Sequence, residues 1–385
     1  MKKYYIETFG CQANIKDGQI MSGTLDALDF SQTDDFKEAD VIIINTCSVR
    51  QKSEDKVYGW GMKLGNPIAH EVKIYEKKGH QVVFITGCMV GSAKGDRKRY
   101  DIKVLKDKMP WANYMLAPDE EYKIPEILVK EGLVSDWGGA TLSKRAALIE
   151  TAYVNISTGC DNFCTFCVVP YSRGKEISRT KGEILHEINH LVSRGYKKVL
   201  LIGQNVNSWG LDTKTKFQLR AGSIHKIPFA SLLREIHKVK EIEKISFISS
   251  NPFDFTQDLI DALKLSKVDR YLHMAVQSGN NEILKAMNRR HTIEEFKNLV
   301  TAIKKAVPDI TFGTDIIVGF PGETEEQFMD TVNLFKWMKF NVAFISIYSS
   351  RIGTSAAKFL KDNVLLSEKK RRHKYLMDVW KETLK

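Results

Sequence analysis

Hydrophobic runs alternate with amphipathic stretches along the first third of the chain. Three short runs, at 3–8, 40–45 and 82–86, are rich in β-branched and aromatic residues and predict strands. Longer stretches near 17–28 and 51–78 have helical spacing, the second interrupted around Gly65 to Pro67. Strands that alternate with helices in this way predict a parallel sheet in an α/β domain.

A second alternation of strands and helices begins near residue 150. Three of its helices are predicted to open with Thr180, Thr292 and Thr324, each followed three residues later by Glu or Gln in a capping box. The strands are predicted at 153–156, 198–202, 244–249, 271–276, 310–318 and 341–347. Six βα units are fewer than the eight that close a TIM barrel, so we predict an open, partial (β/α)6 barrel.

The pattern weakens between these two regions, from 113 to about 145. Turn residues such as Pro118, Pro125 and the pair Gly138-Gly139 interrupt it, so we place the domain boundary near 139–149. A chain of 385 residues is long enough for two domains. We therefore predict an α/β domain over 1–145 and a partial barrel over 146–385.

The composition is that of a globular protein, with 43% hydrophobic residues. No apolar run is long enough to cross a bilayer, and the N-terminal residues lack the apolar stretch of a signal peptide, so we expect a cytoplasmic protein without membrane association. The formal net charge of +11 favours a polyanionic partner such as nucleic acid. Basic residues concentrate at 94–108 and 369–374, although either stretch alone could be a solvated helix face.

Three closely spaced cysteines form the first candidate site. Cys160, Cys164 and Cys167 follow the predicted strand 153–156, at the end of the barrel where active sites lie. Thiolates suit zinc or an iron–sulfur cluster. A structural zinc site needs four protein ligands, but no Cys follows Cys167 and the nearest downstream His is His186. Three thiolates on a cubane would leave one iron open for a substrate or cofactor; zinc and a chance cluster of core thiols are the alternatives.

The other three cysteines each follow a predicted strand of the first domain. Cys11 and Cys88 come directly after a glycine, and Cys47 follows Asn45-Thr46. The carboxyl ends of parallel strands meet at one edge of a sheet, so these three residues would meet there. The sequence therefore predicts a second three-thiolate site, although any one of these residues alone could be an ordinary buried cysteine.

Polar residues also follow other strands of the predicted barrel. Their amide and hydroxyl groups could bind a cofactor or substrate, whereas the alternative for each is a turn or a helix cap. An aromatic residue stands before the last cysteine of the motif. We name as candidate cofactor-binding residues Phe166, Gln204, Asn205, Asn207, Gln277 and Ser278.

With both cysteine groups placed, the chain resembles the radical S-adenosylmethionine (SAM) methylthiotransferases across nearly its whole length. Within that family, the stretches 46–50 and 203–209 are most similar to the branch that modifies dimethylallyladenosine in tRNA. They are less similar to the branches that modify threonylcarbamoyladenosine or a ribosomal protein. The matching stretches are Thr8-Phe-Gly-Cys-Gln-Ala-Asn14, Asn45-Thr-Cys-Ser-Val-Arg50, Thr86-Gly-Cys88, Gly159-Cys-Asp-Asn-Phe-Cys-Thr-Phe-Cys-Val-Val-Pro-Tyr-Ser-Arg-Gly174, Gly203-Gln-Asn-Val-Asn207 and Ile317-Val-Gly-Phe-Pro-Gly-Glu-Thr324.

The resemblance implies two [4Fe–4S] clusters with different tasks. Cys160, Cys164 and Cys167 would hold the cluster that binds and cleaves SAM, and the other three cysteines would hold an auxiliary cluster that presents sulfur. The implied reaction adds a methylthio group to carbon 2 of an isopentenylated adenosine next to the anticodon. That ring C–H has no useful acidity, so a radical initiator is needed.

The resemblance also implies partners and leaves alternatives. The anticodon stem-loop of tRNA would be the substrate, and an electron donor such as flavodoxin or ferredoxin would supply the reductant. The alternatives are the same chemistry on threonylcarbamoyladenosine in tRNA or on a ribosomal protein, and a non-catalytic iron–sulfur protein that binds RNA.

Three departures from the family pattern bear on this reading. Family members carry a C-terminal β-barrel (TRAM) domain that grips tRNA, and this sequence ends at Lys385 without it. Either the sequence is a fragment, or RNA binding depends on the basic stretches, or substrate affinity is low. Ala275 stands where relatives usually have Pro, and Asn251 where they usually have His.

Overall fold

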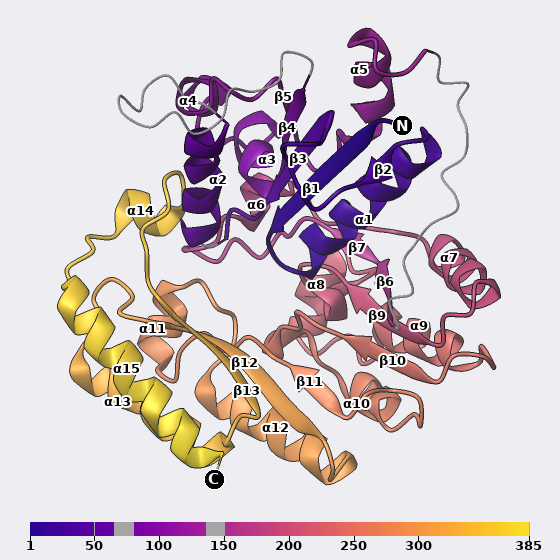
Figure 1. Cartoon of the computed structure of the whole chain (residues 1–385). Coiled ribbons are helices and arrows are strands. Elements are labelled where there is room, and N and C mark those ends of the chain that lie inside the picture. Colours follow the sequence, from indigo (N-terminus) through magenta and orange to yellow (C-terminus); the bar gives the residue numbers. More distant parts are fainter. Residues whose placement is uncertain (50, 65–80, 136–150, 385) are drawn as a thin grey trace. The chain divides into compact units, whose positions relative to one another are not determined.

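The chain divides into two compact units. The computed structural model describes residues 1–49, 51–64, 81–135 and 151–384 (Figure 1). One unit is Met1–Ile149 together with Val168–Lys175, and the other is Glu150–Cys167 together with Glu176–Lys385. Val168–Lys175, which the predicted division at 145/146 places in the second domain, is thus part of the first unit. The predicted boundary at 139–149 lies outside the described residues.

A parallel sheet forms the centre of the first unit. Its described strands lie in the order β2-β1-β3-β4-β5, and all of their pairings are parallel. The three strands predicted from the hydrophobic runs are present within one residue of their predicted ends, whereas the two edge strands are too short to give a pattern. The strands are β1 (Lys3–Phe9), β2 (Ser31–Gln32), β3 (Val41–Thr46), β4 (Val82–Gly87) and β5 (Tyr114–Leu116).

Helices cover both faces of this sheet. They are α1 (Gln12–Ala27), α2 (Gln51–Lys63), α3 (Cys88–Lys94), α4 (Ile102–Lys108), η1 (Glu121–Lys123), α5 (Ile124–Lys130) and α6 (Val169–Ser172). Side chains of α1 and α5 share a hydrophobic cluster with Ile43 and Phe84, whereas those of α2, α3 and α4 share another with Ile42 and Val83. The helices therefore change face between β1 and β3, the place where open α/β sheets bind ligands.

The second unit is a partial barrel of parallel strands, as predicted (Figure 1). Its strands are β6 (Thr151–Asn155), β9 (Lys198–Ile202), β10 (Lys244–Phe247), β11 (Tyr271–His273), β12 (Thr311–Val318) and β13 (Val342–Ile347). The order is β6-β9-β10 followed by β11-β12-β13, and single bridges such as Ser250 with Met274 join the two halves. β10 and β11 end earlier than predicted, because isolated bridges replace the regular ladder there.

Helices alternate with these strands and enclose one large hydrophobic cluster. The capping boxes predicted at Thr180, Thr292 and Thr324 are all present. The helices are α7 (Lys181–Ser193), η2 (Val206–Ser208), α8 (Thr213–Arg220), α9 (Pro228–His237), η3 (Pro252–Asp254), α10 (Gln257–Leu263), α11 (Asn281–Ala286), α12 (Ile293–Ala306), α13 (Glu325–Met338), α14 (Ser355–Phe359) and α15 (Leu366–Thr383). A short antiparallel pair, β7 (Ser157–Thr158) with β8 (Ile177–Ser178), flanks the cysteine loop. No described helix combines the length and apolar character needed to cross a bilayer.

Candidate metal centres

Cys11, Cys47 and Cys88 lie beyond the carboxyl ends of three neighbouring strands, β1, β3 and β4. Cys11 is the N-cap of α1, and Cys88 is the first residue of α3. The structure brings the three side chains together, since Cys11 and Cys88 both act on the pKa of the Cys47 thiol. None of the six cysteines of the chain forms a disulfide. We call Cys11, Cys47 and Cys88 the sheet-edge triad.

Local sequence explains why the sheet-edge triad converges. Gly87 has a φ of +93°, and a Cβ there would lie 2.5 Å from the carbonyl oxygen of Thr46, so only glycine lets β4 end this close to β3. Asn14 Nδ2 donates to Asn45 Oδ1 at 3.0 Å, and Asn45 Nδ2 donates to the Asn14 carbonyl at 2.7 Å. This buried pair joins the start of α1 to the end of β3.

The three thiols of the sheet-edge triad differ in pKa. Hydrogen bonding from Cys47, supported by the positive charge of Arg173, lowers the pKa of Cys11 to about 5 and the pKa of Cys88 to about 7. The pKa of Cys47 is raised, because hydrogen bonding to the sulfurs of Cys11 and Cys88 favours its protonated form. Cys11 and Cys88 are therefore disposed to be thiolates, the form in which cysteine binds metals.

A buried guanidinium lies against the sheet-edge triad. Arg173 Nε donates to Cys88 Sγ at 3.2 Å, and Arg173 Nη2 donates to Asp17 Oδ2 at 2.6 Å. Although burial opposes it, the charges of Cys88 and Asp17 raise the pKa of Arg173 well above its usual value. Sequence reasoning missed both residues, because Asp17 and Arg173 are far apart in the chain and no spacing rule connects them.

Cys160, Cys164 and Cys167 lie in the loop that leaves β7 in the second unit, and we call them the loop triad. Burial first, and then the charges of Cys167 and Cys164, raise the pKa of Cys160, so the three sulfurs interact. The Cys167 amide donates to the Cys164 carbonyl at 2.9 Å. Phe163, with a φ of 49°, is in the left-handed region that non-glycine residues rarely adopt.

The segment after α11 holds this loop in place. Asn288 Nδ2 donates to the carbonyls of Phe163 at 3.0 Å and Asn162 at 3.3 Å. The Thr165 amide donates to the Met287 carbonyl at 3.0 Å. These bonds can support the strained backbone at Phe163, since they fix the loop on both sides of Cys164.

A second guanidinium contacts the loop triad. Arg289 Nη1 donates to Cys164 Sγ at 3.5 Å, and its Nη2 donates to the Ala275 carbonyl at 2.5 Å. The guanidinium lies 5.1 Å from the ring centre of Phe253, whose ring is also 5.0 Å from Arg220. Each triad therefore has one arginine against one of its sulfurs.

Gln204, Asn205 and Asn207 take different places after β9. Gln204 Oε1 and Asn205 Oδ1 are buried and have no hydrogen-bond partner among the described residues. Asn207 instead bonds the loop after β10, because its Nδ2 donates to the carbonyls of Asn251 and Asp254 at 2.9 Å and its Oδ1 accepts from the Asn251 amide. The first two amides have unused oxygens for a ligand, whereas Asn207 positions the loop.

Phe166, Gln277 and Ser278 also differ in their surroundings. Phe166 packs against a small hydrophobic cluster that includes Met287 and Phe320, so it anchors the cysteine loop. Gln277, four residues after the end of β11, has a φ of 76°, a strained conformation of the kind found at ligand sites. Ser278 Oγ accepts from the Asn280 amide at 3.2 Å and thus helps to start α11.

Further buried polar atoms lie near these residues and were not predicted. Ser157 Oγ, Ser250 Oγ, Arg289 Nε and both ring nitrogens of His291 have no hydrogen-bond partner within the described parts of the chain. Burial, and next the charge of Arg289, lower the pKa of His291 to about 3. Buried polar atoms normally have partners, so this set indicates a polar ligand or bound water. In the sequence, an isolated histidine such as His291 does not indicate a ligand site.

The geometry of the triads bears on the kind of metal site. Among the described residues, no group of three or more His, Cys, Asp or Glu is arranged to hold a single metal ion. Iron–sulfur clusters make a different demand, because each thiolate binds a different iron of the cluster. Each triad offers three cysteines and has a guanidinium hydrogen-bonded to one of its sulfurs, which fits that demand.

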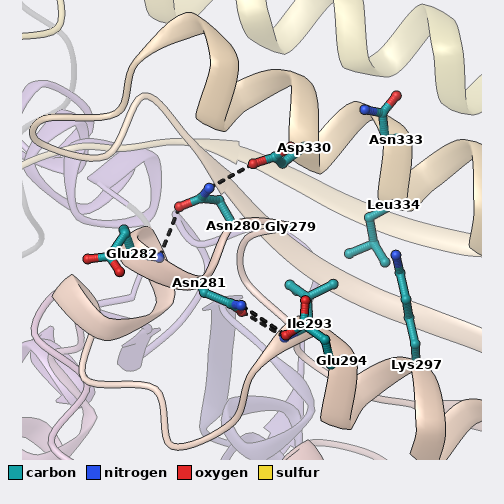
Figure 2. Close-up of a pocket in the computed structure, with 10 residues that line it drawn as sticks. All are labelled: Gly279, Asn280, Asn281, Glu282, Ile293, Glu294, Lys297, Asp330, Asn333 and Leu334. Carbon is teal, nitrogen blue, oxygen red and sulfur yellow. Dashed lines mark hydrogen bonds between the residues drawn. The ribbon is translucent and has the colours of Figure 1, made fainter.

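A polar pocket of about 340 Å³ lies on the second unit, lined by residues of α11, α12 and α13 and of the turn before α11 (Figure 2). Its side chains largely bond one another: Asn280 Nδ2 donates to Asp330 at 2.7 Å and Asn281 Nδ2 to Glu294 at 2.9 Å. No cysteine lines it, so we assign it no part in the chemistry. The lining residues are Gly279, Asn280, Asn281, Glu282, Ile293, Glu294, Lys297, Asp330, Asn333 and Leu334.

The two basic stretches differ in how far their charges are compensated. In 369–374, Lys369 pairs with Asp362 at 2.7 Å, Arg371 with Glu325 at 2.5 Å, and Arg372 with Glu323 at 2.9 Å. Much of this stretch therefore stabilises the second unit. In 94–108, Lys98, Lys103 and Lys106 are exposed, which leaves this stretch as the better candidate for contact with a polyanion.

Comparison with family models gives the class of protein. The model of the radical SAM superfamily matches residues 154–335, and the model described as uncharacterized protein family UPF0004 matches residues 3–106. A radical SAM methyltransferase from Kitasatospora setae, TsrM, solved with cobalamin and a [4Fe–4S] cluster, superposes with a TM-score of 0.59 over 93% of this chain and 77% of its own, at 12% identity. That likeness supports the fold alone, whereas the match of the family model identifies a radical SAM protein.

Two curated relatives define the branch. The tRNA-2-methylthio-N(6)-dimethylallyladenosine synthase of Clostridium novyi (strain NT) is 39% identical over 397 residues, covering 100% of this chain and 82% of the relative. The protein of that name from Clostridium botulinum (strain Hall) is 37% identical, covering 99% and 82%. The chain belongs to the tRNA-2-methylthio-N(6)-dimethylallyladenosine synthase family, which confirms the predicted resemblance.

Proposed function

We propose that this protein adds a methylthio group to carbon 2 of N(6)-dimethylallyladenosine next to the anticodon of tRNA. The observation that carries the proposal is the presence of two separate cysteine triads, one in each unit: the sheet-edge triad beyond the carboxyl ends of β1, β3 and β4, and the loop triad in the loop that follows β6 and β7. The names of the relatives supply the substrate class. As a protein that acts on tRNA, it would work in the cytoplasm.

The loop triad would hold the [4Fe–4S] cluster that binds SAM. When bound there, the cluster and SAM supply the radical that activates an inert C–H bond. The chain's part is to bind and orient the cofactor: Gln204 Oε1, Asn205 Oδ1 and Ser250 Oγ lie buried without partners among the described residues, as acceptors and donors for an amino acid or ribose group would. His291, kept neutral by burial, can donate one hydrogen bond and accept another, and neither ring nitrogen has a partner among the described residues.

The sheet-edge triad would hold the auxiliary [4Fe–4S] cluster that presents sulfur. Cys11 is exposed at the edge of the sheet, whereas Cys47 and Cys88 are buried. Such a cluster would thus be anchored on its inner side and open on its outer side. This arrangement suits a group that must hand an atom to a separate substrate.

Binding of the tRNA and supply of electrons complete the proposal. Lys98, Lys103 and Lys106 are exposed near or on α4 and suit contacts to phosphates of the anticodon stem-loop. Reduction of the loop-triad cluster would need a low-potential donor of the flavodoxin or ferredoxin type.

Nucleoside analysis tests the proposed activity. The anaerobically reconstituted protein would be incubated with SAM, dithionite and tRNA that carries N(6)-dimethylallyladenosine, and the digested nucleosides would be measured by mass spectrometry. We expect the methylthio nucleoside to form. Parallel reactions with tRNA that carries threonylcarbamoyladenosine, and with ribosomal protein, control for the other branches; product only there would contradict the assigned substrate.

Single cysteine variants test the division of labour between the triads. We expect Cys160→Ala to abolish formation of 5′-deoxyadenosine, because it removes a ligand of the SAM-binding cluster. Cys47→Ala should retain part of the SAM cleavage and lose sulfur insertion. Equal loss of cleavage in both variants would contradict two separate tasks.

A further inference from the structure

The assigned chemistry leaves unexplained the buried cation beside the sheet-edge triad. We propose that Arg173 is a positioning residue of the auxiliary metal centre, which acts through Cys88 and raises the reduction potential of that centre. The inference rests on the proposed function, because it takes Cys11, Cys47 and Cys88 to hold a [4Fe–4S] cluster. Nothing in the family match or in the names of the relatives assigns this role.

The guanidinium is fixed from two directions. Its Nε faces Cys88 Sγ at 3.2 Å, while Nη2 is bonded to Asp17 Oδ2 at 2.6 Å. The side chain of Arg173 is only 6% exposed and that of Asp17 only 11%. A carboxylate that orients the donor of a ligand sulfur is the arrangement expected of an outer-shell interaction at a metal site.

The backbone that carries Arg173 is fixed to the helix that carries Cys88. Helix α6, directly before Arg173, packs on α3, and Cys88 is the first residue of α3. The fit is close, because a Cβ on Gly91 of α3 would lie 2.1 Å from the Ser172 carbonyl oxygen. The packing of α6 on α3 within the first unit thus holds the Arg173 donor next to the Cys88 acceptor.

Arg173 is the cation that a hydrogen bond joins to a sulfur of the sheet-edge triad in the described part of the chain. Its charge acts on both Cys11 and Cys88. The buried carboxyl of Glu121 lies in the same network, and burial, then the charge of Asp17, raise its pKa. Reduction adds negative charge to a cluster, and both a nearby cation and a hydrogen bond to a ligand sulfur favour that state.

The test measures the potential of one cluster at a time. The full chain with Cys160, Cys164 and Cys167 changed to Ala keeps the sheet-edge triad alone, and its cluster is titrated anaerobically with absorbance and electron paramagnetic resonance. In this background, Arg173→Met keeps much of the volume without the charge, and Arg173→Lys keeps the charge. We expect a more negative midpoint potential for Arg173→Met and an intermediate one for Arg173→Lys.

A matched control separates this effect from the loss of any buried arginine. Arg372 is as buried as Arg173, lies in the second unit and has carboxylate partners among the described residues, such as Glu323 at 2.9 Å. We expect Arg372→Met to leave the midpoint potential unchanged. An equal shift in Arg372→Met would overturn the inference.

Each remaining outcome decides the inference. An unchanged potential in Arg173→Met, at unchanged iron content, overturns it and leaves the proposed function intact. Loss of iron in Arg173→Met with retention in Arg173→Lys supports it, whereas loss in both variants assigns Arg173 a purely steric role and overturns it. A parent that binds no iron overturns the proposed function as well, and this is seen before Arg173 is changed.

Discussion

Arg173 Nε lies 3.2 Å from Cys88 Sγ, although 85 positions separate the two residues in the chain. The contact exists because Val168–Lys175 belongs to the first unit, whereas Cys167, six positions before Arg173, belongs to the second. The segment that follows the loop triad therefore completes the surroundings of the sheet-edge triad. Single substitutions in and around this segment can test the contact.

Asp17→Asn should shift the potential of the auxiliary centre in the direction opposite to Arg173→Met. The carboxylate partly compensates the guanidinium, so its removal leaves more positive charge beside the cluster and favours the reduced state. The same single-cluster background and titration measure the effect. Asp26→Asn, on the same helix but bonded to Tyr4 at 2.8 Å, serves as the control and should change nothing.

Gly91→Ala should destabilise the first unit by about 1–3 kcal/mol and lower iron uptake by the sheet-edge triad, because the new Cβ would collide with the Ser172 carbonyl. A Cβ on Gly23, in helix α1, would meet nothing within 4 Å, so Gly23→Ala should be neutral or stabilising by up to ~1 kcal/mol. Urea unfolding of the metal-free protein compares the two. Equal stability would mean that α6 does not pack on α3 in solution.

Asn288→Gly should reduce the iron bound by the loop triad. Asn288 has a φ of 56°, which glycine adopts without strain, so this variant removes the hydrogen bonds to Asn162 and Phe163 and keeps the backbone. The loss of the two hydrogen bonds should destabilise the folded conformation of the cysteine loop by about 1–3 kcal/mol. Iron content in a background without the sheet-edge cysteines gives the measurement, with the exposed Asn333→Ala as control. Full iron loading would show that the side chain is dispensable.

His291 should make the metal-free protein less stable in mild acid. Its pKa of about 3 in the folded chain is below the usual value of 6.5, so the neutral form stabilises the fold fully above pH 6.5. That stability is lost as the pH falls from 6.5 toward 3, by up to ~1.4 kcal/mol per pH unit. Urea unfolding between pH 4.5 and 6.5 should show a smaller slope for His291→Phe than for the wild type. The exposed His190→Gln is the control, and identical slopes in all three would contradict this account.

Much of the fold follows from local signals in the sequence. The buried β-branched runs at 41–46 and 82–87 predict the central strands, and the capping boxes at Thr180, Thr292 and Thr324 predict where helices begin. β2, with two residues, and β5, with three, are too short to show a period, and so the sequence pattern does not reveal them.

The sites follow from sequence only where spacing or strand ends indicate them. The loop triad is a local spacing, and the sheet-edge triad follows from strand order. Arg173 and Arg289 have no such signal, because each reaches its cysteine through tertiary packing alone. The basic stretch at 369–374 shows the converse: its charges suggest a polyanion, but acidic partners such as Asp362 and Glu323 neutralise much of it in the fold.

The most direct test of the whole account is the iron and acid-labile sulfide bound per chain after anaerobic reconstitution. The wild type should bind about eight irons, and the variant with Cys160, Cys164 and Cys167 changed to Ala about four, as two independent [4Fe–4S] clusters require. Four irons in the wild type and none in the variant would contradict the account, because Cys11, Cys47 and Cys88 would then hold no cluster.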